Sequence, residues 1–455
     1  MPDIIIVILA VLFVLGVAIN IHEFGHFIVA KMLGMRVEAY SFFGLGPRVW
    51  GFKKGNTDYR ISAIPLGAFV KLYGDEATAS LEGGESEGEN VPESELYELR
   101  PRWQKFLVMI GGPFMNVLLA LAIPFTMALI QGVPAIPAPI VGYVKTGGAA
   151  ENAGIKKGDQ IVKFDGVENP TWLRIQEDAL LQNNRETDIS VKRDGKRIDT
   201  TIVPSTVELK GQKIGSIDLA PDVGVEPVVI GQIQSDMPAA SSGLKKGDRI
   251  TEVNGKTVRN AQDAKSYIVD AGDNPIDVVV ERGGKQLDFT TSTKKVDGEN
   301  RIGIVFSNSY KGAYDKVGVA GAAAWAVNFN WSVLRLTGKA FGQMFSGSRS
   351  VKDAGISGPI GIVGAISQTV KDAGFIGLLP MLAMISLSLG VFNLLPIPLL
   401  DGGQIAVLAI ESFLALFGMT LSLAVKEKIQ LAGLGLILAL MVLVMYLDIS
   451  RIIGS

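Results

Sequence analysis

The chain has 455 residues, of which 48% are hydrophobic and 19% are charged, and its net charge is -2. This length exceeds one ordinary domain, and the apolar content is typical of a membrane protein that carries soluble regions. The near-neutral charge gives no sign of a nucleic-acid partner. Because the chain contains no cysteine, a disulfide framework, a CxxC redox site and cysteine-bound zinc are excluded.

The first apolar run begins at Ile4 and contains the only two histidines of the chain. No Lys or Arg precedes the run, and it exceeds the apolar core of a signal peptide, so residues 4–30 predict a retained transmembrane helix. His22 and His26 are four residues apart, which places both imidazoles on one helix face within reach of one metal ion. Glu23 stands where a carboxylate can act as a general base.

Two histidines and a glutamate can also form a solvated helix face by chance. At membrane depth, however, one ionisable residue costs at least about 2.5 kcal/mol, and three at metal-binding spacing favour a functional site. Since the chain has no third histidine and no cysteine, a zinc ion bound here needs an Asp or a Glu as its third protein ligand.

Basic residues populate the segment between this helix and the next apolar run. By the positive-inside rule, the segment is cytoplasmic and the N-terminus lies outside. Residues 37–73 predict a β-hairpin or small sheet beside the metal motif, which either only packs or receives substrate backbone at an edge strand of residues 37–64. Residues 76–98 are acidic and rich in Gly and Ser, as expected of a flexible surface loop.

Residues 106–130 predict the second transmembrane helix, and they include several small or polar residues. Small residues let helices approach closely, so Gly111 and Gly112 are expected to face the first helix. Asn116 either forms a structural hydrogen bond between helices or belongs to the site, and we favour the structural interpretation.

An internal repeat follows the second helix, with an offset of 89 residues, as between Gly154 and Gly243 (243 - 154 = 89). Each copy has the turn Ala-x-x-x-Gly-[Leu/Ile]-x-x-Gly-Asp, a strand and an Asx-Gly hairpin, and it resembles PDZ domains in the circularly permuted bacterial arrangement. The resemblance implies peptide-carboxylate loops at Ile214-Gly215 and Ile302-Gly303. The resemblance leaves open whether the domains bind peptides or only exclude bulky partners sterically.

The last third of the chain predicts amphipathic linker helices and two more spans, at residues 375–400 and 431–447. Pro396 and Pro398 interrupt the third predicted span, because proline lacks a backbone N–H and breaks a helix. Asp401 follows at once. It either caps the helix that begins near Gln404 or supplies the missing metal ligand, and the lack of another His or Cys favours the ligand.

His22-Glu23-x-x-His26 together with Asn393-x-x-Pro396-x-Pro398-x-x-Asp401-Gly402 resembles the site-2 protease family of intramembrane zinc metalloproteases. The resemblance implies that one zinc ion per chain is bound by His22, His26 and Asp401. It implies that Glu23 is the catalytic carboxylate. The expected substrate contacts are Asn393, Pro396 and Pro398.

The same resemblance implies the partners and the location. The substrates would be single-span membrane proteins, such as an anti-sigma factor already trimmed on its outer side. The chain would lie in the inner membrane of a bacterium, with the lipid bilayer around it, the active site toward the cytoplasm and the PDZ-like domains in the periplasm. Those domains could take peptide or protein ligands.

Two other functions fit some of these features. A membrane-anchored PDZ scaffold with a non-catalytic metal is one, but structural zinc sites usually have four His or Cys ligands and this chain offers two. A transporter with a proton relay is the other, but no repeat relates the membrane segments.

The predicted fold class is a multi-pass α-helical membrane protein with four transmembrane helices, a membrane-associated β-hairpin or sheet and two α+β PDZ-like domains. The predicted domains, in chain order, are an N-terminal membrane-core segment (1–132), a first PDZ-like domain (133–221), a second PDZ-like domain (222–309), amphipathic linker helices (310–374) and a C-terminal membrane-core segment (375–455).

Overall fold

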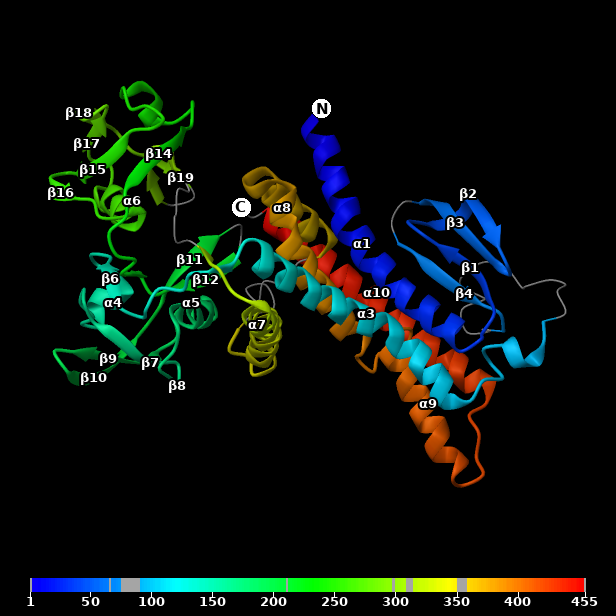
Figure 1. Ribbon diagram of the computed structural model, residues 1–455. Helices are drawn as coiled ribbons and strands as arrows, with labels where there is room; N and C mark the ends of the chain where they lie inside the picture. Colours follow the sequence, from blue (N-terminus) through cyan, green and yellow to red (C-terminus); the bar gives the residue numbers. More distant parts are fainter. Residues whose placement is uncertain are drawn as a thin grey trace. The chain divides into compact units, whose positions relative to one another are not determined.

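The computed structural model describes residues 2–64, 67–74, 91–209, 212–296, 299–307, 314–349 and 358–453. The chain divides into two compact units (Figure 1). The helical unit comprises residues 1–133, 316–335 and 356–454, and the repeat unit comprises residues 134–315 and 336–355.

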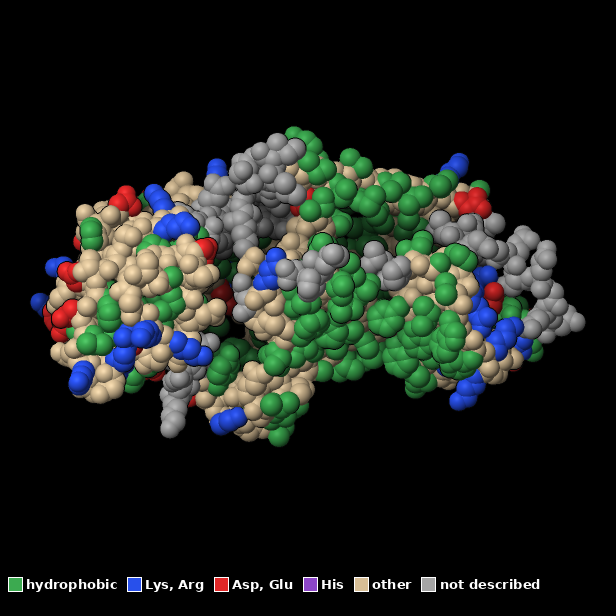
Figure 2. Space-filling model, turned by 90° about the horizontal axis from the view of Figure 1, so that it is seen from above, with side chains coloured by type: hydrophobic (Ala, Val, Ile, Leu, Met, Phe, Trp, Pro, Cys, Tyr) green, Lys and Arg blue, Asp and Glu red, His purple; other side chains and the backbone are tan. Residues whose placement is uncertain are grey.

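Long apolar helices build the helical unit. Their bounds are α1 (Pro2–Met32), α3 (Arg102–Ile130), α8 (Pro359–Asn393), α9 (Asp401–Ala415) and α10 (Leu423–Ile453). Within the described residues, four segments are long and apolar enough to cross a membrane: Ile4–Met32, Arg102–Ile130, Ala373–Asn393 and Ala424–Ser450. Hydrophobic side chains cover much of the visible face of this unit, whereas Lys, Arg, Asp and Glu are scattered over the repeat unit (Figure 2). These four candidate helices agree with the four transmembrane helices predicted from the sequence.

Helices α1, α3 and α8 pack against one another. The approach of α1 and α3 is close because both present glycine at the contact, as predicted. A Cβ on Gly25 would lie 2.1 Å from the Gly111 carbonyl oxygen, and a Cβ on Gly112 would lie 2.4 Å from His26 Nε2. No larger residue fits at either position without separating the helices.

The predicted bounds of the last two spans differ from the structure. α8 contains a break at Gly374 (φ 65°), and it ends at Asn393 rather than at Leu400. The reason is that Pro396 and Pro398 cannot donate the helical hydrogen bonds, so residues 394–400 form a tight turn before α9. The fourth span, Ala424–Ser450, is longer than the predicted 431–447.

A four-stranded sheet follows α1. Its strands are β1 (Val37–Ser41), β2 (Leu45–Lys54), β3 (Thr57–Ile64) and β4 (Phe69–Leu72). The order is β2-β3-β1-β4, with β1 parallel to β3 and antiparallel to β4. The predicted sheet is therefore present, but it is a mixed sheet rather than a single hairpin, and its two edges are β2 and β4.

The acidic segment 76–98 lies largely outside the described residues, which resume at residue 91. Its described end forms the 3-10 helix η1 (Glu93–Glu95). There Arg36 Nε donates to Glu95 Oε2 at 2.7 Å. This end of the predicted flexible loop is thus tied to the segment that leads into β1.

The two copies of the repeat share the same core succession of strands and helix. The first copy contains β6 (Val141–Val144), α4 (Ala149–Asn152), β7 (Gln160–Phe164), β8 (Val167–Glu168), α5 (Trp172–Leu180), β9 (Thr187–Arg193), β10 (Lys196–Ile202), β11 (Ser205–Leu209), β12 (Gln212–Ser216) and β13 (Leu219–Pro221). The second contains β14 (Val228–Ile233), η2 (Pro238–Ser241), β15 (Arg249–Val253), β16 (Lys256–Thr257), α6 (Ala261–Asp270), β17 (Ile276–Arg282), β18 (Lys285–Thr291), β19 (Lys294–Val296), β20 (Glu299–Arg301) and β21 (Ile304–Phe306). The remaining strands are β5 (Val133–Pro134) and β22 (Tyr314–Asp315).

The Gly-Asp of the repeated turn forms a buried ion pair in each copy. Arg193 donates to both oxygens of Asp159, with both bonds at 2.6 Å. Arg282 donates to both oxygens of Asp248 at 2.6 and 2.7 Å. Both carboxylates are 1% exposed. We call each pair a turn clamp, and the clamp explains why the turn motif recurs.

The sequence prediction places the peptide-carboxylate loop of the first copy at the wrong residues. Ile214-Gly215 lies inside β12 and pairs with β11. In the second copy, the buried Ile302 is followed by Gly303 at φ 85° and then by β21; in the first, the buried Ile217 is followed by Asp218 at φ 53° and then by β13. The offset here is 302 - 217 = 85, because the hairpin before the loop spans 205–216 in the first copy but 294–301 in the second.

Two helical segments occupy the described part of the predicted linker 310–374, as expected: one long helix and then the first part of α8, up to its break at Gly374. The long helix precedes α8. This helix, α7 (Val319–Phe345), has half in each unit. In the helical unit, Asn330 Nδ2 donates to the Ala120 carbonyl of α3 at 2.9 Å. In the repeat unit, Gln343 Nε2 donates to the Leu181 carbonyl at 3.1 Å. The predicted break near Gly358 coincides with the start of α8.

Candidate metal centre

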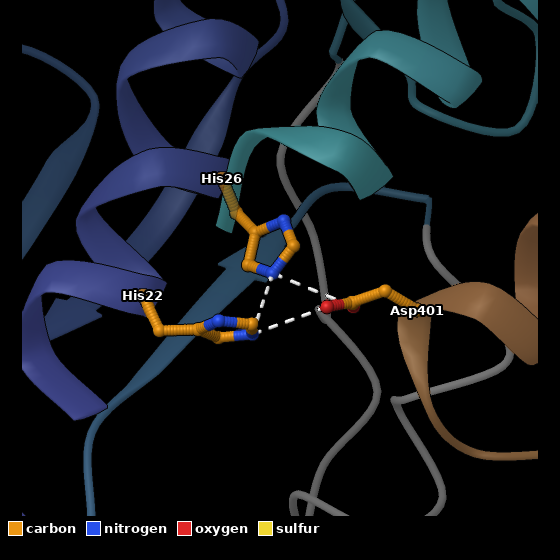
Figure 3. A group of neighbouring side chains, drawn as sticks. All are labelled: His22, His26 and Asp401. Atoms are coloured by element: carbon orange, nitrogen blue, oxygen red, sulfur yellow. Dashed lines mark hydrogen bonds and ion pairs between the residues drawn. The ribbon is translucent and has the colours of Figure 1, made fainter. Parts of the chain in front are cut away.

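Three predicted ligands meet in the helical unit. His22 and His26 project from α1, and Asp401 is the first residue of α9. His22 Nε2 lies 3.1 Å from Asp401 Oδ2, His26 Nε2 lies 3.4 Å from Asp401 Oδ1, and the two Nε2 atoms are 3.2 Å apart. Figure 3 shows the three side chains pointing toward one another. The structure thus brings together residues that are separated by more than 370 positions (401 - 26 = 375).

Glycines allow Asp401 to reach the histidines. A Cβ on Gly402 would lie 2.2 Å from the Leu394 carbonyl oxygen, and a Cβ on Gly403 would lie 2.1 Å from the Ile397 carbonyl oxygen. The proline-containing turn therefore folds directly onto the first turn of α9. The alternative role of Asp401 as a helix cap is wrong, because α9 begins at Asp401 and its N-cap residue is Leu400.

The ring nitrogens that do not face Asp401 have their own partners. His26 Nδ1 lies 2.7 Å from the Val108 carbonyl oxygen, which only accepts hydrogen bonds. The proton of a neutral His26 therefore sits on Nδ1, and Nε2 has a free lone pair. His22 Nδ1 lies 3.1 Å from Asn116 Nδ2. Asn116 thus contacts the site as well as linking α3 to its neighbours.

The donor set fits a zinc ion. Among the described residues, His22, His26 and Asp401 offer ligand atoms that all lie within 4.8 Å of one another. Asp401 Oδ2 is buried and makes no well-aligned hydrogen bond, with His22 Nε2 beside it at 3.1 Å. A buried carboxylate oxygen without a donor is costly unless a cation compensates it. Two imidazoles and one carboxylate are a known catalytic zinc set that leaves a fourth position open.

A cavity of about 410 Å³ adjoins the three ligands. Glu23 lines it, and so do Asn393 and Gln404. Asn393 Nδ2 lies 3.2 Å from His22 Nε2. Pro396 and Pro398 do not line this cavity: Pro396 is exposed, and Pro398 packs so closely on α10 that a Cβ on Gly433 would lie 2.5 Å from its carbonyl oxygen.

A sheet edge also lines the cavity. The main lining strand is β4, through Phe69 and Val70, and the predicted region 37–64 contributes Leu45 at the start of edge strand β2. Sequence reasoning missed β4 as the lining strand because four residues carry too little periodicity to be read. Its outer edge has no partner strand in the described sheet, and the Val70 backbone there donates a hydrogen bond to Glu23.

Comparison with known proteins identifies the family. The sequence pattern of peptidase family M50 matches residues 10–440. The chain belongs to this family. The regulator of sigma-E protease RseP of Salmonella typhimurium (strain 14028s / SGSC 2262) is 30% identical to this M50 protein over 97% of this chain and 98% of its own length. The protein of the same name from Escherichia coli (strain K12) is 30% identical over 96% and 97%.

Two further similarities concern the metal and the repeat. A protein of Pasteurella multocida (strain Pm70), named as a candidate zinc metalloprotease, is 29% identical to this M50 chain over 96% of it and 97% of its own length. The PDZ domain of an SdrC-like protein from Listeria monocytogenes is 23% identical, with a TM-score of 0.18, and covers 20% of this chain and 98% of that domain.

Membership of family M50 confirms the resemblance seen in the sequence. The protein is a zinc metalloprotease of the site-2 protease type, which acts within the membrane. The three-ligand group and Glu23 lie inside the matched residues 10–440.

Proposed function

We propose that the protein cleaves the transmembrane segments of single-span membrane proteins at this centre, with one zinc ion held by His22, His26 and Asp401. The observation that carries the proposal is the meeting of these three side chains beside a cavity that Glu23 lines. Sites of this kind need three protein ligands, an open position and a base.

The chemistry divides between the metal and the protein. When bound, zinc supplies Lewis-acid polarisation of the scissile carbonyl and activates water as the nucleophile. Glu23 takes the proton of the attacking water and delivers it to the leaving amine, a role worth about 10²–10⁴ in rate. Because Glu23 follows His22 directly on α1, the helix fixes the distance between the base and the ligands.

The substrate must be unwound before it can be cut, since a helix hides its peptide bonds in hydrogen bonds between residues i and i-4. Strand β4 is an edge of the described sheet, at which an extended segment can add as a further strand. The Asn393 amide, beside His22, can hold the backbone near the scissile bond. Pro396, exposed on the same turn, can contact the substrate outside the cavity, while Pro398 shapes the turn.

The proposed location is the inner membrane of a bacterium. Four apolar helices support a multi-pass protein, and the basic segment between α1 and α3 supports a cytoplasmic sheet and active site. The repeat unit then lies in the periplasm. There its PDZ-like domains exclude substrates with bulky outer regions or bind peptides, and a substrate akin to a trimmed anti-sigma factor fits the names of the relatives.

A cleavage assay tests the proposal. The purified full chain in lipid nanodiscs is incubated with a single-span membrane protein that carries a tag at each end. We expect cleavage within the transmembrane segment, loss of cleavage with a zinc chelator, and recovery when zinc is restored. Cleavage that persists in the chelator, or cleavage only outside the membrane segment, would overturn the proposal.

A further inference from the structure

Two buried polar side chains lie behind His22. Asn116 of α3 is 0% exposed, and its Nδ2 lies 3.1 Å from His22 Nδ1. Ser386 of α8 is also 0% exposed; its Oγ donates to the Asn116 carbonyl oxygen at 2.9 Å and lies 3.3 Å from Asn116 Oδ1. A chain of contacts thus runs from α8 through α3 to one of the two histidines.

Zinc binding sets a condition on this chain of contacts. A neutral imidazole has one N–H and one lone pair. If Nε2 gives its lone pair to zinc, the proton must sit on Nδ1, and a buried Nδ1–H needs an acceptor. His26 meets the condition through the Val108 carbonyl. For His22, the group at the corresponding place is the Asn116 amide, which presents its nitrogen in the structure.

An amide nitrogen donates, so in this orientation His22 Nδ1 accepts, and a neutral ring must then carry its proton on Nε2. That proton would face a second donor, the Asn393 amide nitrogen, at 3.2 Å. Zinc could not then bind Nε2. A half-turn of the Asn116 amide exchanges Oδ1 and Nδ2 with almost no change in shape. His22 Nδ1–H then donates to Oδ1, Nδ2 donates to Ser386 Oγ, and the Ser386 hydroxyl still donates to the Asn116 carbonyl. Every polar group in the trio has a partner in that state.

We propose that Asn116 is the positioning residue of the zinc site. Its amide oxygen holds the His22 proton on Nδ1 and so frees Nε2, and Ser386 fixes the amide in that orientation. The inference rests on the proposed zinc role of His22. Partners of this kind, which contact a ligand rather than the metal, typically change metal affinity by about 10–100-fold when they are removed.

Substitutions of Asn116 test whether its side chain acts as a hydrogen-bond acceptor for His22 or only fills space. Asn116→Leu keeps the volume but removes the acceptor, so the zinc dissociation constant should rise about 10–100-fold. Asn116→Asp keeps acceptor oxygens and should restore affinity to within a few-fold of the original. Ser386→Ala should give an intermediate loss. The matched control is Ser388→Ala, because Ser388 lies on the same helix and bonds only to the Met384 carbonyl of its own helix at 2.9 Å among the contacts described.

A spectroscopic readout follows from the composition. The chain has only two histidines, so labelling histidine with ¹⁵N marks only the two imidazoles of the site. In the zinc-loaded full chain, and in Asn116→Asp, we expect His22 to carry its proton on Nδ1. In zinc-free Asn116→Leu we expect His22 to lose this preference, while His26 keeps its proton on Nδ1 through Val108. A packing defect alone would not move one tautomer and spare the other.

The outcomes are distinct. If Asn116→Leu keeps the original zinc affinity and the original His22 tautomer, or if Asn116→Asp is as impaired as Asn116→Leu, the positioning role is overturned although the zinc protease stands. If the unsubstituted chain binds no zinc, the proposed function falls and this inference with it. If Asn116→Leu fails to fold, the zinc affinities of Asn116→Asp and Ser386→Ala decide. An unchanged affinity in Ser386→Ala together with a loss of affinity in Asn116→Asp contradicts the inference.

Discussion

The carboxylate of Asp401 has different surroundings from the carboxylates of the two turn clamps. In the repeat unit, Asp159 and Asp248 are each closed by two hydrogen bonds from an arginine. In the helical unit, the buried Asp448 accepts from the Gly358 and Gly361 backbone N–H groups. Asp401 instead faces two imidazoles, and its Oδ2 makes no well-aligned hydrogen bond. The carboxylates of the repeat are therefore complete within their own domains. A cation bound together with the two imidazoles would complete Asp401, and this difference supports the proposed metal centre in the helical unit.

The two kinds of site also differ in how the chain builds them. Each turn clamp joins residues 34 positions apart in one domain (193 - 159 = 34 and 282 - 248 = 34). The metal centre instead joins helices from both ends of the chain, through α1, α3, α8 and α9. Loss of a turn clamp should therefore change the stability of its own domain. The geometry of the metal centre should instead depend on the packing of the whole helical unit.

The largest expected effect comes from Glu23→Gln. This nearly isosteric change removes the proposed base, so cleavage should fall by at least about 100-fold. Zinc content and thermal stability should stay at the original values, because Glu23 is not a proposed ligand. Cleavage is measured with the tagged single-span substrate, and zinc by elemental analysis of the same sample. Near-original cleavage would contradict the assignment of the base.

Deletion of residues 133–309 should change substrate choice rather than chemistry, since no proposed catalytic residue lies there. The deletion variant should cut both a full-length and an outer-trimmed substrate, whereas the complete chain should prefer the trimmed one. The ratio of the two cleavage rates is the measurement. If the variant still rejects the full-length substrate and cuts the trimmed one normally, the steric filter is wrong.

Asp248→Ala should break the second clamp and leave the metal centre intact. Removing the carboxylate leaves Arg282 without its partner, and the local unfolding temperature should fall by roughly 5 °C or more for a domain of this size. Hydrogen exchange of strands β15 and β17 reports this change, and Asp159→Ala is the matched variant in the first copy. Loss of zinc without faster exchange in these strands would contradict the comparison.

The smallest effect is the response of the clamps to acid. Burial raises the pKa of Asp159 and Asp248. The hydrogen bonds from Arg193 and Arg282, those from the Lys156 and Lys245 backbone N–H groups and the nearby positive charges together outweigh burial, and both pKa values lie below the ordinary one. A carboxylate whose pKa is lower in the folded state stabilises the fold fully above its unfolded pKa, about 3.9, and loses this contribution as the pH falls through the folded pKa. The protection factors of amides in β7 and β15 should therefore fall below about pH 4. Flat protection factors throughout this acid range would contradict the lowered pKa.

Much of the metal centre could be predicted from sequence. His22 and His26 are the only histidines, and their spacing needs only helix geometry to place them together. Asp401 followed by exclusion, since the chain offers no cysteine and no third histidine. The repeat could be recognised because its turn needs glycine and a buried Asp at fixed positions, and the clamps show why.

The remaining features depend on contacts that no local pattern encodes. Asn116 meets His22 only because Gly25 and Gly111 bring α1 and α3 together. The offset between the two copies changes before Ile217 because the preceding hairpin is longer in the first copy than in the second. The repeated turn motif is the same in both copies and gives no sign of this difference. Strand β4 is recognisable only through its pairing with β1, where Tyr40 faces Val70.

Zinc content of Asp401→Asn, measured beside the unsubstituted chain, tests the central claim most directly. Asparagine keeps the shape of the side chain but removes the anionic ligand, so the buried oxygen no longer needs a cation. We predict about one zinc per unsubstituted chain, following from the single three-ligand group among the described residues, and a loss of most zinc together with chelator-sensitive cleavage in the variant. Full zinc occupancy in Asp401→Asn would contradict the account.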